Sequence, residues 1–249
     1  MDKQYYKDYY FLERKHWWFT ARKVILEDLI RRKINPTIPL KILNIGTATG
    51  AGTLMLQTFG NVTSIEYDED CCKFLNEELK ITTQQGSITA LKFEHEQFDL
   101  VCAFDVIEHV EDDGLAAAEM LRVCKKDGFV FTTVPAFMLL WSEHDVVNHH
   151  YRRYRINQFR NLFKVDDSKI VFKSYFNFFF FIPIAIIRIL LWPFQKNKLK
   201  TNVAKSDFSR FNAEGILNIF FFRIFLLEKT LLKFFNFPFG VSICLMIKK

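Results

Sequence analysis

The stretch Lys-Ile-Leu-Asn-Ile-Gly-Thr-Ala-Thr-Gly, residues 41–50, decides the fold of this 249-residue chain. Residues 40–45 form a short, mainly apolar run that is typical of a buried parallel strand, and small residues follow it. Gly46 and Gly50 lack a Cβ, so the backbone can turn tightly there and approach a ligand closely. With the helix predicted for residues 53–59, the stretch indicates a strand, a ligand-binding loop and a helix in succession.

Strands and helices continue to alternate along the chain. The predicted strands span residues 62–66, 98–104, 129–134 and 170–175, and the predicted helices span residues 16–34, 70–79 and 113–124. Asp70 is the expected N-cap of its helix, and Gly128 is expected to stop the last helix after the basic pair Lys125 and Lys126. The alternation predicts a doubly wound, mostly parallel α/β sheet, in which ligands bind beyond the C-terminal ends of the strands.

An acidic residue follows the glycine loop at an informative spacing. Glu66 ends the second strand, where a carboxylate can accept hydrogen bonds from the ribose hydroxyls of an adenosine cofactor. The pattern G-x-G-x-x-G is not met, because Ala48 and Ala51 occupy its second and third glycine positions, and this argues against a nicotinamide cofactor. The alternative interpretation is an ordinary turn between strand and helix followed by a solvated glutamate.

Several stretches resemble class I S-adenosylmethionine-dependent methyltransferases. They are residues 41–50 (the first motif), 98–110 (the fourth-strand motif), 121–128 (the helix end before the fifth strand) and 238–247 (the last strand). The resemblance is greatest to a bacterial subgroup of the domain type 11/12, which has a Trp-Trp-Phe start and a His-Asp…His-x-Arg-Arg-Tyr stretch. Here these are residues 17–19 and 144–154. Ubiquinone-pathway O-methyltransferases are more distantly similar.

The resemblance implies a fold and a division of the chain. The expected architecture is a Rossmann-like, doubly wound sheet of seven strands with an antiparallel last strand. Residues 1–249 are expected to form a single methyltransferase domain, residues 1–39 an N-terminal helical cap, and residues 177–237 a hydrophobic helical insertion before the last strand.

The resemblance also implies S-adenosylmethionine as the cofactor and a set of residues that contact it. Glycines and Thr47 of the loop would face the methionine part, and Glu66 would hold the ribose. Tyr67, Ser87 and Ile88 would lie against the adenine, and two residues after the fourth strand would lie near the sulfonium. The full set is Asn44, Gly46, Thr47, Gly50, Glu66, Tyr67, Ser87, Ile88, Phe104 and Asp105.

Three positions of this set depart from the family pattern. Asn44 and Ser87 stand where the family usually has acids, and Ala48 replaces the middle glycine. Asparagine and serine still form hydrogen bonds, and alanine adds one methyl group. We therefore expect weakened cofactor affinity, and keep a non-catalytic, methyltransferase-like binding module, associated with a membrane or a protein partner, as the alternative.

A histidine-rich segment follows the strand at residues 129–134. Methyl transfer to a hydroxyl or protonated amine requires a base, and histidine titrates near neutrality. We expect His150, or His144 oriented by a carboxylate such as Asp145, to be that base. The alternative is a set of loop hydrogen bonds that fix a lid. No metal site is predicted, because the histidine and aspartate spacing is poor for one.

Arginines and tyrosines come directly after these histidines. Arg152, Arg153 and Arg155, with Tyr151 and Tyr154, are candidates to clamp a phosphate or carboxylate. A solvated helix start is the alternative interpretation. Nucleic acid is not expected as a partner, because the basic residues are not interleaved along one long face.

The C-terminal third is rich in phenylalanine. The chain has 29 phenylalanines and a formal charge of +6, and apolar stretches at residues 176–194 and 216–237 flank a lysine-rich segment. We expect helices that lie at an anionic membrane surface, with a buried lid or a homodimer face as the alternative. A membrane location would favour a lipid-linked methyl acceptor, beside small molecules, with oxygen as the expected target atom.

The five cysteines form no CxxC pair. Together with an N-terminus that lacks a signal-peptide core, this favours the cytoplasm, with peripheral contact at the inner face of the cytoplasmic membrane.

Overall fold

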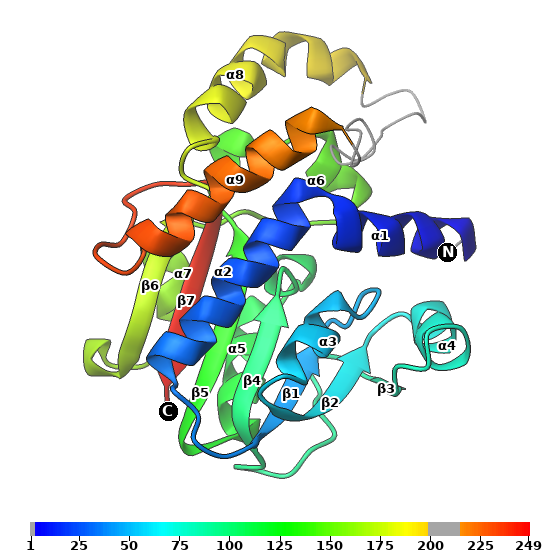
Figure 1. Cartoon of the computed structure of the whole chain (residues 1–249), viewed down its shortest axis with the longest axis vertical. Coiled ribbons are helices and arrows are strands. Elements are labelled where there is room, and N and C mark those ends of the chain that lie inside the picture. Colours follow the sequence, from blue (N-terminus) through cyan, green and yellow to red (C-terminus); the bar gives the residue numbers. More distant parts are fainter. Residues whose placement is uncertain (1–2, 199–214) are drawn as a thin grey trace.

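The computed structural model describes residues 3–198 and 215–249, and a single mixed sheet forms its centre (Figure 1). The strand order is β3-β2-β1-β4-β5-β7-β6. The strands are β1 (Leu40–Ile45), β2 (Gly60–Glu66), β3 (Thr83–Gln85), β4 (Phe98–Phe104), β5 (Cys124–Pro135), β6 (Ile170–Phe176) and β7 (Ser242–Lys248). The strands from β3 to β5 run parallel, and β7 is antiparallel to β5 and β6. The predicted Rossmann-like sheet with an antiparallel last strand is confirmed.

Helices cover both faces of the sheet. They are α1 (Lys3–Lys15), α2 (Trp17–Lys33), α3 (Ala51–Leu56), α4 (Glu69–Glu77), α5 (Asp113–Val123), α6 (Glu143–Val147), α7 (Ile156–Leu162), α8 (Phe181–Lys198) and α9 (Ile216–Leu231). In Figure 1, α2, α3 and α9 lie in front of the sheet, and α5 and α7 lie behind it. Ile42, Leu43 and Phe131 of the central strands are fully buried as a result.

Two predicted helix caps were wrong. Helix α4 is capped by Asp68, whose carboxylate accepts from the Cys71 N–H, so Asp70 lies in the first turn. Helix α5 ends at Val123 because Cys124 already has extended backbone and begins β5. Gly128 therefore lies within a strand and does not stop the helix.

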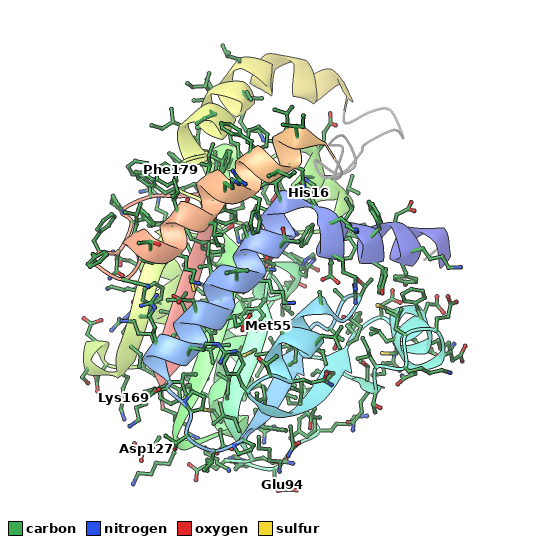
Figure 2. The ribbon with its side chains drawn as sticks, viewed as in Figure 1. His16, Met55, Glu94, Asp127, Lys169 and Phe179 are labelled. Carbon is green, nitrogen blue, oxygen red and sulfur yellow. The ribbon has the colours of Figure 1, made fainter. Side chains whose placement is uncertain are left out.

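The C-terminal edge of the parallel strands lies beneath α1 and the start of α2. Figure 2 labels His16 near this edge and Glu94 and Asp127 at the opposite end of the molecule. The imidazole of His16 caps α2 by accepting from the Trp18 N–H at 3.2 Å. The chain thereby turns between α1 and α2 directly above the ends of β1 and β4.

Helix α9 packs against α2. The side chain of Asn218 accepts from the Trp17 N–H at 2.7 Å and donates to the Lys15 carbonyl at 2.9 Å, which joins α9 to the turn between α1 and α2. The ring of Phe225 is fully buried and contacts the Trp17 ring edge to face. One face of α9 therefore belongs to the core of the protein.

The other face of α9, and much of α8, carries exposed apolar side chains. They are Ile182, Ile186, Ile187, Ile189 and Leu190 on α8, and Ile216, Leu217, Ile219, Phe220 and Leu227 on α9. We call these ten side chains the apolar surface. Across residues 3–198 and 215–249, no helix is long and apolar enough to cross a membrane.

Candidate cofactor and acceptor site

The loop after β1 passes through left-handed backbone at three positions. Gly46, Ala48 and Gly50 have φ angles of 75°, 49° and 88°. A Cβ added at Gly46 would overlap Cγ2 of Val106, and one at Gly50 would overlap Cδ1 of Ile81. Both glycines are therefore required by the turn, whereas Ala48 adopts a conformation that glycine reaches at lower free energy.

Glu66 binds the backbone of this loop from the end of β2. Its Oε2 accepts from the Ala48 N–H at 3.0 Å, and its Oε1 accepts from the Tyr67 N–H at 2.8 Å. Tyr67 is 77% exposed, so its ring is open to a planar ligand. Beyond β3, the Ser87 hydroxyl pairs with that of Thr89 at 2.8 Å, and Ile88 is buried.

Two predicted contact residues lie beneath the loop. The amide of Asn44 donates to the Thr53 hydroxyl at 2.9 Å, and the Thr47 hydroxyl donates to the Ile65 carbonyl at 3.0 Å. Both side chains are buried. In this geometry they hold the loop to β2 and α3.

The N-terminal helices close over the same loop. The Thr49 hydroxyl donates to the Glu13 carboxylate, and the Arg14 guanidinium donates to the Thr49 carbonyl at 3.1 Å. From α2, the Arg22 guanidinium pairs with Asp105 at 2.7 Å and donates to the Thr133 hydroxyl at 2.9 Å. Residues 13–22 thus contact both the loop and the ends of β4 and β5.

A small pocket of about 40 Å³ lies where α2 meets α3. Its lining comprises Glu13, Phe19, Arg22, Lys23, Leu26, Ala51, Gly52, Met55 and Phe104. Figure 2 labels Met55 between the two helices. Burial raises the pKa of Glu13 despite its hydrogen bond from Thr49. A pocket of this volume has room for a few water molecules and is smaller than a typical ligand site.

The predicted catalytic residues meet beyond the end of β5. Asp145 is fully buried; its Oδ1 lies 2.9 Å from Nδ1 of His150 and 2.7 Å from Nε of Arg153. Its Oδ2 accepts from the Ser142 N–H at 2.8 Å. Burial alone would raise the pKa of Asp145, but the hydrogen bond from His150 and the Arg153 charge hold it well below its usual range. The His144 ring lies 6.0 Å from that of His150.

Two of the three arginines after His150, Arg152 and Arg153, pair with carboxylates of the protein itself. Arg153 is buried against Asp145, and Arg152 pairs with Asp113 at 2.8 Å. The Tyr154 hydroxyl also donates to Asp113, at 2.9 Å. The predicted anion clamp is therefore not supported at Arg152 and Arg153, whereas the exposed Arg155 is the N-cap of α7 and fits the alternative of a solvated helix start.

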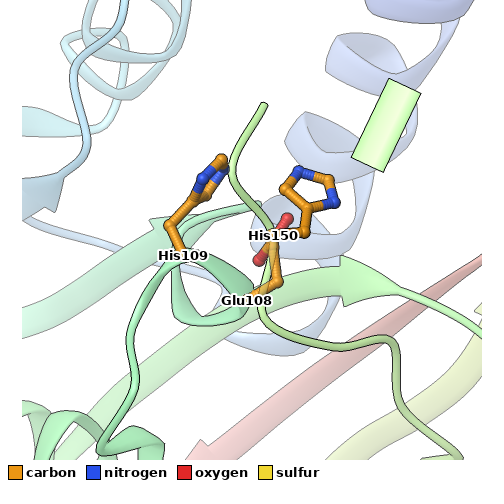
Figure 3. A group of neighbouring side chains, drawn as sticks. All are labelled: Glu108, His109 and His150. Carbon is orange, nitrogen blue, oxygen red and sulfur yellow. The ribbon is translucent and has the colours of Figure 1, made fainter. Parts of the chain in front are cut away.

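Glu108 and His109, from the 3-10 helix η1 (Ile107–His109), complete this region (Figure 3). Glu108 is fully buried, and within the described residues neither of its carboxylate oxygens has a hydrogen-bond partner. Burial, and then the nearby charge of Asp105, raises the pKa of Glu108 well above its ordinary value. The His109 and His150 rings lie 4.6 Å apart, edge to face.

Residues 43–132 match the profile of a family described as "Methyltransferase domain". The matched segment runs from β1 into β5, so this part of the chain is similar to a methyltransferase domain. No curated protein matches the chain.

Solved structures share the fold of this methyltransferase domain. A SAM-dependent methyltransferase from Archaeoglobus fulgidus is 14% identical, with a TM-score of 0.54, over 91% of this chain and 94% of its own. A protein from Galdieria sulphuraria, described as a sarcosine dimethylglycine methyltransferase, is 14% identical, with a TM-score of 0.56, over 93% and 86%. The [4+2]-cyclase SpnF, 14% identical with a TM-score of 0.52 over 90% and 79%, shows that the fold alone does not fix the reaction.

The comparisons support S-adenosylmethionine as the cofactor of the methyltransferase domain, and the site's polar groups fit its amino-acid end. Nε of Arg22 is buried and, within the described part of the chain, has no hydrogen-bond partner. Arg22 and Glu13 present a guanidinium and a carboxyl group to one pocket, and these groups are able to bind the carboxylate and the ammonium of an α-amino acid.

The sequence patterns missed four residues of this site: Glu13, Arg22, Glu108 and His109. Arg22 lies beside Lys23 and has no distinguishing local pattern, whereas Glu108 and His109 interrupt the apolar run Val106 to Val110. The signal that could have found Glu108 and His109 is a titratable residue inside an apolar run at the end of a strand. Nothing local marks Glu13, whose partners lie far along the chain.

Proposed function

We propose that the chain is an enzyme that transfers a methyl group from S-adenosylmethionine to a small or lipid-linked acceptor, at an oxygen atom. The observation that carries this proposal is the Asp145–His150 pair, which lies at the same edge of the sheet as the glycine loop and Glu66. S-adenosylmethionine supplies a methyl group that its sulfonium already activates, so the protein contributes positioning, exclusion of water and removal of a proton.

The proposed cofactor contacts are divided along the loop. Gly46 and Gly50 would allow close approach of the backbone, and Glu66, which accepts from the Ala48 N–H, would hold the ribose. Glu13 and Arg22 would bind the ammonium and carboxylate of the methionine part. Phe104, which lines the same pocket, would shield the transferred group from water.

His150 is the proposed proton acceptor. A carboxylate only accepts hydrogen bonds, so Nδ1 of His150 carries the proton that faces Asp145, and in the neutral imidazole Nε2 is the acceptor nitrogen. Arg153 fixes the Asp145 carboxylate. The carboxylate in turn holds the His150 imidazole in one orientation. This arrangement suits removal of a proton from a hydroxyl group.

A calorimetric titration with S-adenosylmethionine and S-adenosylhomocysteine tests the cofactor site. We expect micromolar binding by the parent protein, and binding weaker by about tenfold or more in Glu66→Ala, because a buried hydrogen bond to a charged group contributes roughly 1.5–3 kcal/mol. The matched control is Glu69→Ala, a nearby glutamate that pairs with Lys73 at the surface. Equal affinity in the two variants would remove the ribose assignment.

The non-catalytic module remains the second candidate, and the left-handed Ala48 at a glycine position is the observation that favours it. Folded parent protein that binds neither cofactor at millimolar concentration would establish this alternative. Cofactor binding together with unchanged turnover in His150→Ala would retain the enzyme but return His150 to a structural role.

The apolar surface supports a further part of the proposal, peripheral contact with an anionic membrane from the cytoplasmic side. Its helices also carry the exposed Arg223 and, just after α9, the exposed Lys233, and the whole chain has a formal charge of +6. Apolar side chains bordered by basic ones are typical of helices that lie in a lipid interface. A lipid-linked acceptor would then reach the enzyme at the membrane surface to which the enzyme is bound.

A further inference from the structure

Three potential metal ligands converge beyond the ends of β4 and β5. One ligand atom each from Glu108, His109 and His150 lies within 4.8 Å of the other two. Figure 3 shows the Glu108 carboxylate between the two imidazole rings. We propose that Glu108, His109 and His150 form a binding site for a divalent transition-metal ion.

The Glu108 side chain is the main argument. It is fully buried, and the described residues offer no hydrogen-bond partner to either carboxylate oxygen. An unpaired charged carboxylate is strongly unfavourable in such a position. Asp105 does not relieve this cost, because it carries the same charge and already pairs with Arg22 at 2.7 Å. A cation between the rings would supply the missing partner.

The surroundings of His150 are those of a metal ligand. Its Nδ1 donates to Asp145 at 2.9 Å, which leaves Nε2 as the coordinating atom. Asp145 also binds Arg153 at 2.7 Å, so the imidazole cannot rotate freely. A carboxylate behind a histidine is the usual device that orients a metal-bound imidazole and increases its basicity.

The donor set narrows the choice of metal. Two imidazole nitrogens and one carboxylate suit Zn²⁺, Co²⁺, Mn²⁺ or Fe²⁺ and are a poor match for Mg²⁺ or Ca²⁺, which prefer oxygen ligands. Three protein ligands leave at least one coordination position open. If the proposed methyl transfer holds, an acceptor hydroxyl can occupy that position and release its proton to water. With a metal bound, Nε2 of His150 coordinates the ion and does not accept a proton. Nε2 is the proton acceptor only in the metal-free protein.

Binding of Co²⁺ by the full chain, after treatment with a chelator, tests the site directly through the visible absorption of the bound ion. We expect one equivalent to bind the parent and to be displaced by Zn²⁺. Glu108→Gln and His109→Ala should each weaken binding by at least about tenfold. The control is His95→Ala, an exposed histidine outside this cluster, which should bind Co²⁺ as the parent does.

Thermal unfolding shows whether the variants remain folded. Glu108→Gln replaces a buried, unpaired carboxyl group with a neutral amide of the same shape, so without metal it should unfold at the temperature of the parent or above it. Co²⁺ should raise the melting temperature of the parent and of His95→Ala, and leave that of Glu108→Gln unchanged. Folded parent protein that takes up no Co²⁺, or uptake that survives both ligand substitutions, would overturn the proposal. Because metal uptake is measured without methyl transfer, failure here leaves the cofactor titration as an independent result.

Discussion

The backbone conformation at Ala48 is unfavourable for an alanine residue. With φ at 49°, alanine is held in the left-handed region, which costs about 1 kcal/mol for a residue with a Cβ. The N–H of Ala48 is nevertheless fixed by the Glu66 carboxylate at 3.0 Å. The loop therefore keeps its left-handed turn while it carries a residue poorly suited to that conformation.

Replacement of Ala48 by glycine should stabilise the protein. Relief of the left-handed strain outweighs the added entropy of the unfolded chain, so we expect Ala48→Gly to raise the free energy of unfolding by roughly 0.5–1 kcal/mol. Urea denaturation measures the difference. The matched control is Ala118→Gly on the exposed side of α5, which should lower stability by about 1 kcal/mol. A loss of stability in both variants would contradict the strain argument.

Individual residues of the site were predictable to different degrees. Gly46, Glu66 and His150 follow from motifs, because their roles depend on local spacing along the chain. Arg22 was not found, because its partners Asp105 and Thr133 come from strands far away in sequence. Such pairs exist only once the sheet is assembled.

At the scale of secondary structure elements, one carboxylate joins β6, α8 and α9. Glu228 on α9 is fully buried and accepts from the backbone N–H groups of Asn177, Phe178 and Phe179 at 2.7, 2.7 and 3.3 Å. Burial raises the pKa of Glu228 to about 7, although these three N–H groups favour the charged form. Glu228, at this joint between the sheet and the two apolar helices, is therefore protonated at mildly acidic pH.

This joint should make stability depend on pH. The pKa of about 7 in the folded protein exceeds the ordinary value of 4.5, so folding favours the protonated form. The contribution is complete below pH 4.5 and is lost as the pH rises to about 7, a loss of roughly 3 kcal/mol at most. Denaturation of the parent and of Glu228→Gln at several pH values isolates it. A stability difference that does not change between pH 4.5 and 7 would contradict the assignment.

The elements of the sheet were largely predictable, and the joints between them were not. Buried parallel strands give continuous apolar runs, which mark β1 and β4 in the sequence. The short edge strand β3 and the polar helix α1 have no such signal. The start of β5 at Cys124 was missed because tertiary pairing with Phe98 extends a strand whose first residues are charged.

The whole molecule separates its phenylalanine-rich C-terminal part into buried and exposed sides. Glu228 and Phe225 bring α9 into the core, so this helix does not simply lie in a lipid interface as its sequence suggested. The apolar surface remains outside, on α8 and on the outer side of α9 (Figure 1). The amino-acid composition shows that apolar residues are numerous in this part of the chain. Only tertiary packing determines which of them are buried in the core.

Vesicle binding tests what covers the apolar surface. We expect the parent to co-sediment with vesicles that contain anionic lipid, less with neutral vesicles, and less at high salt. Ile186, Ile187 and Leu190 are each more than half exposed, and serine at all three should abolish binding without loss of fold. Ile38→Ser is the control, because Ile38 is 72% exposed in the loop before β1, away from these helices.

Sedimentation of the same proteins without lipid separates the membrane from the alternative occupant, a second copy of the chain. If the parent is dimeric, binds no vesicles, and becomes monomeric in the triple serine variant, the apolar surface is a dimer face and the membrane proposal is wrong. If the parent is monomeric and binds anionic vesicles through these residues, lipid is the occupant. Lipid-linked hydroxyl compounds, incorporated in the same vesicles, are then the first acceptors to assay. The enzyme would meet such a substrate at the membrane surface to which it binds.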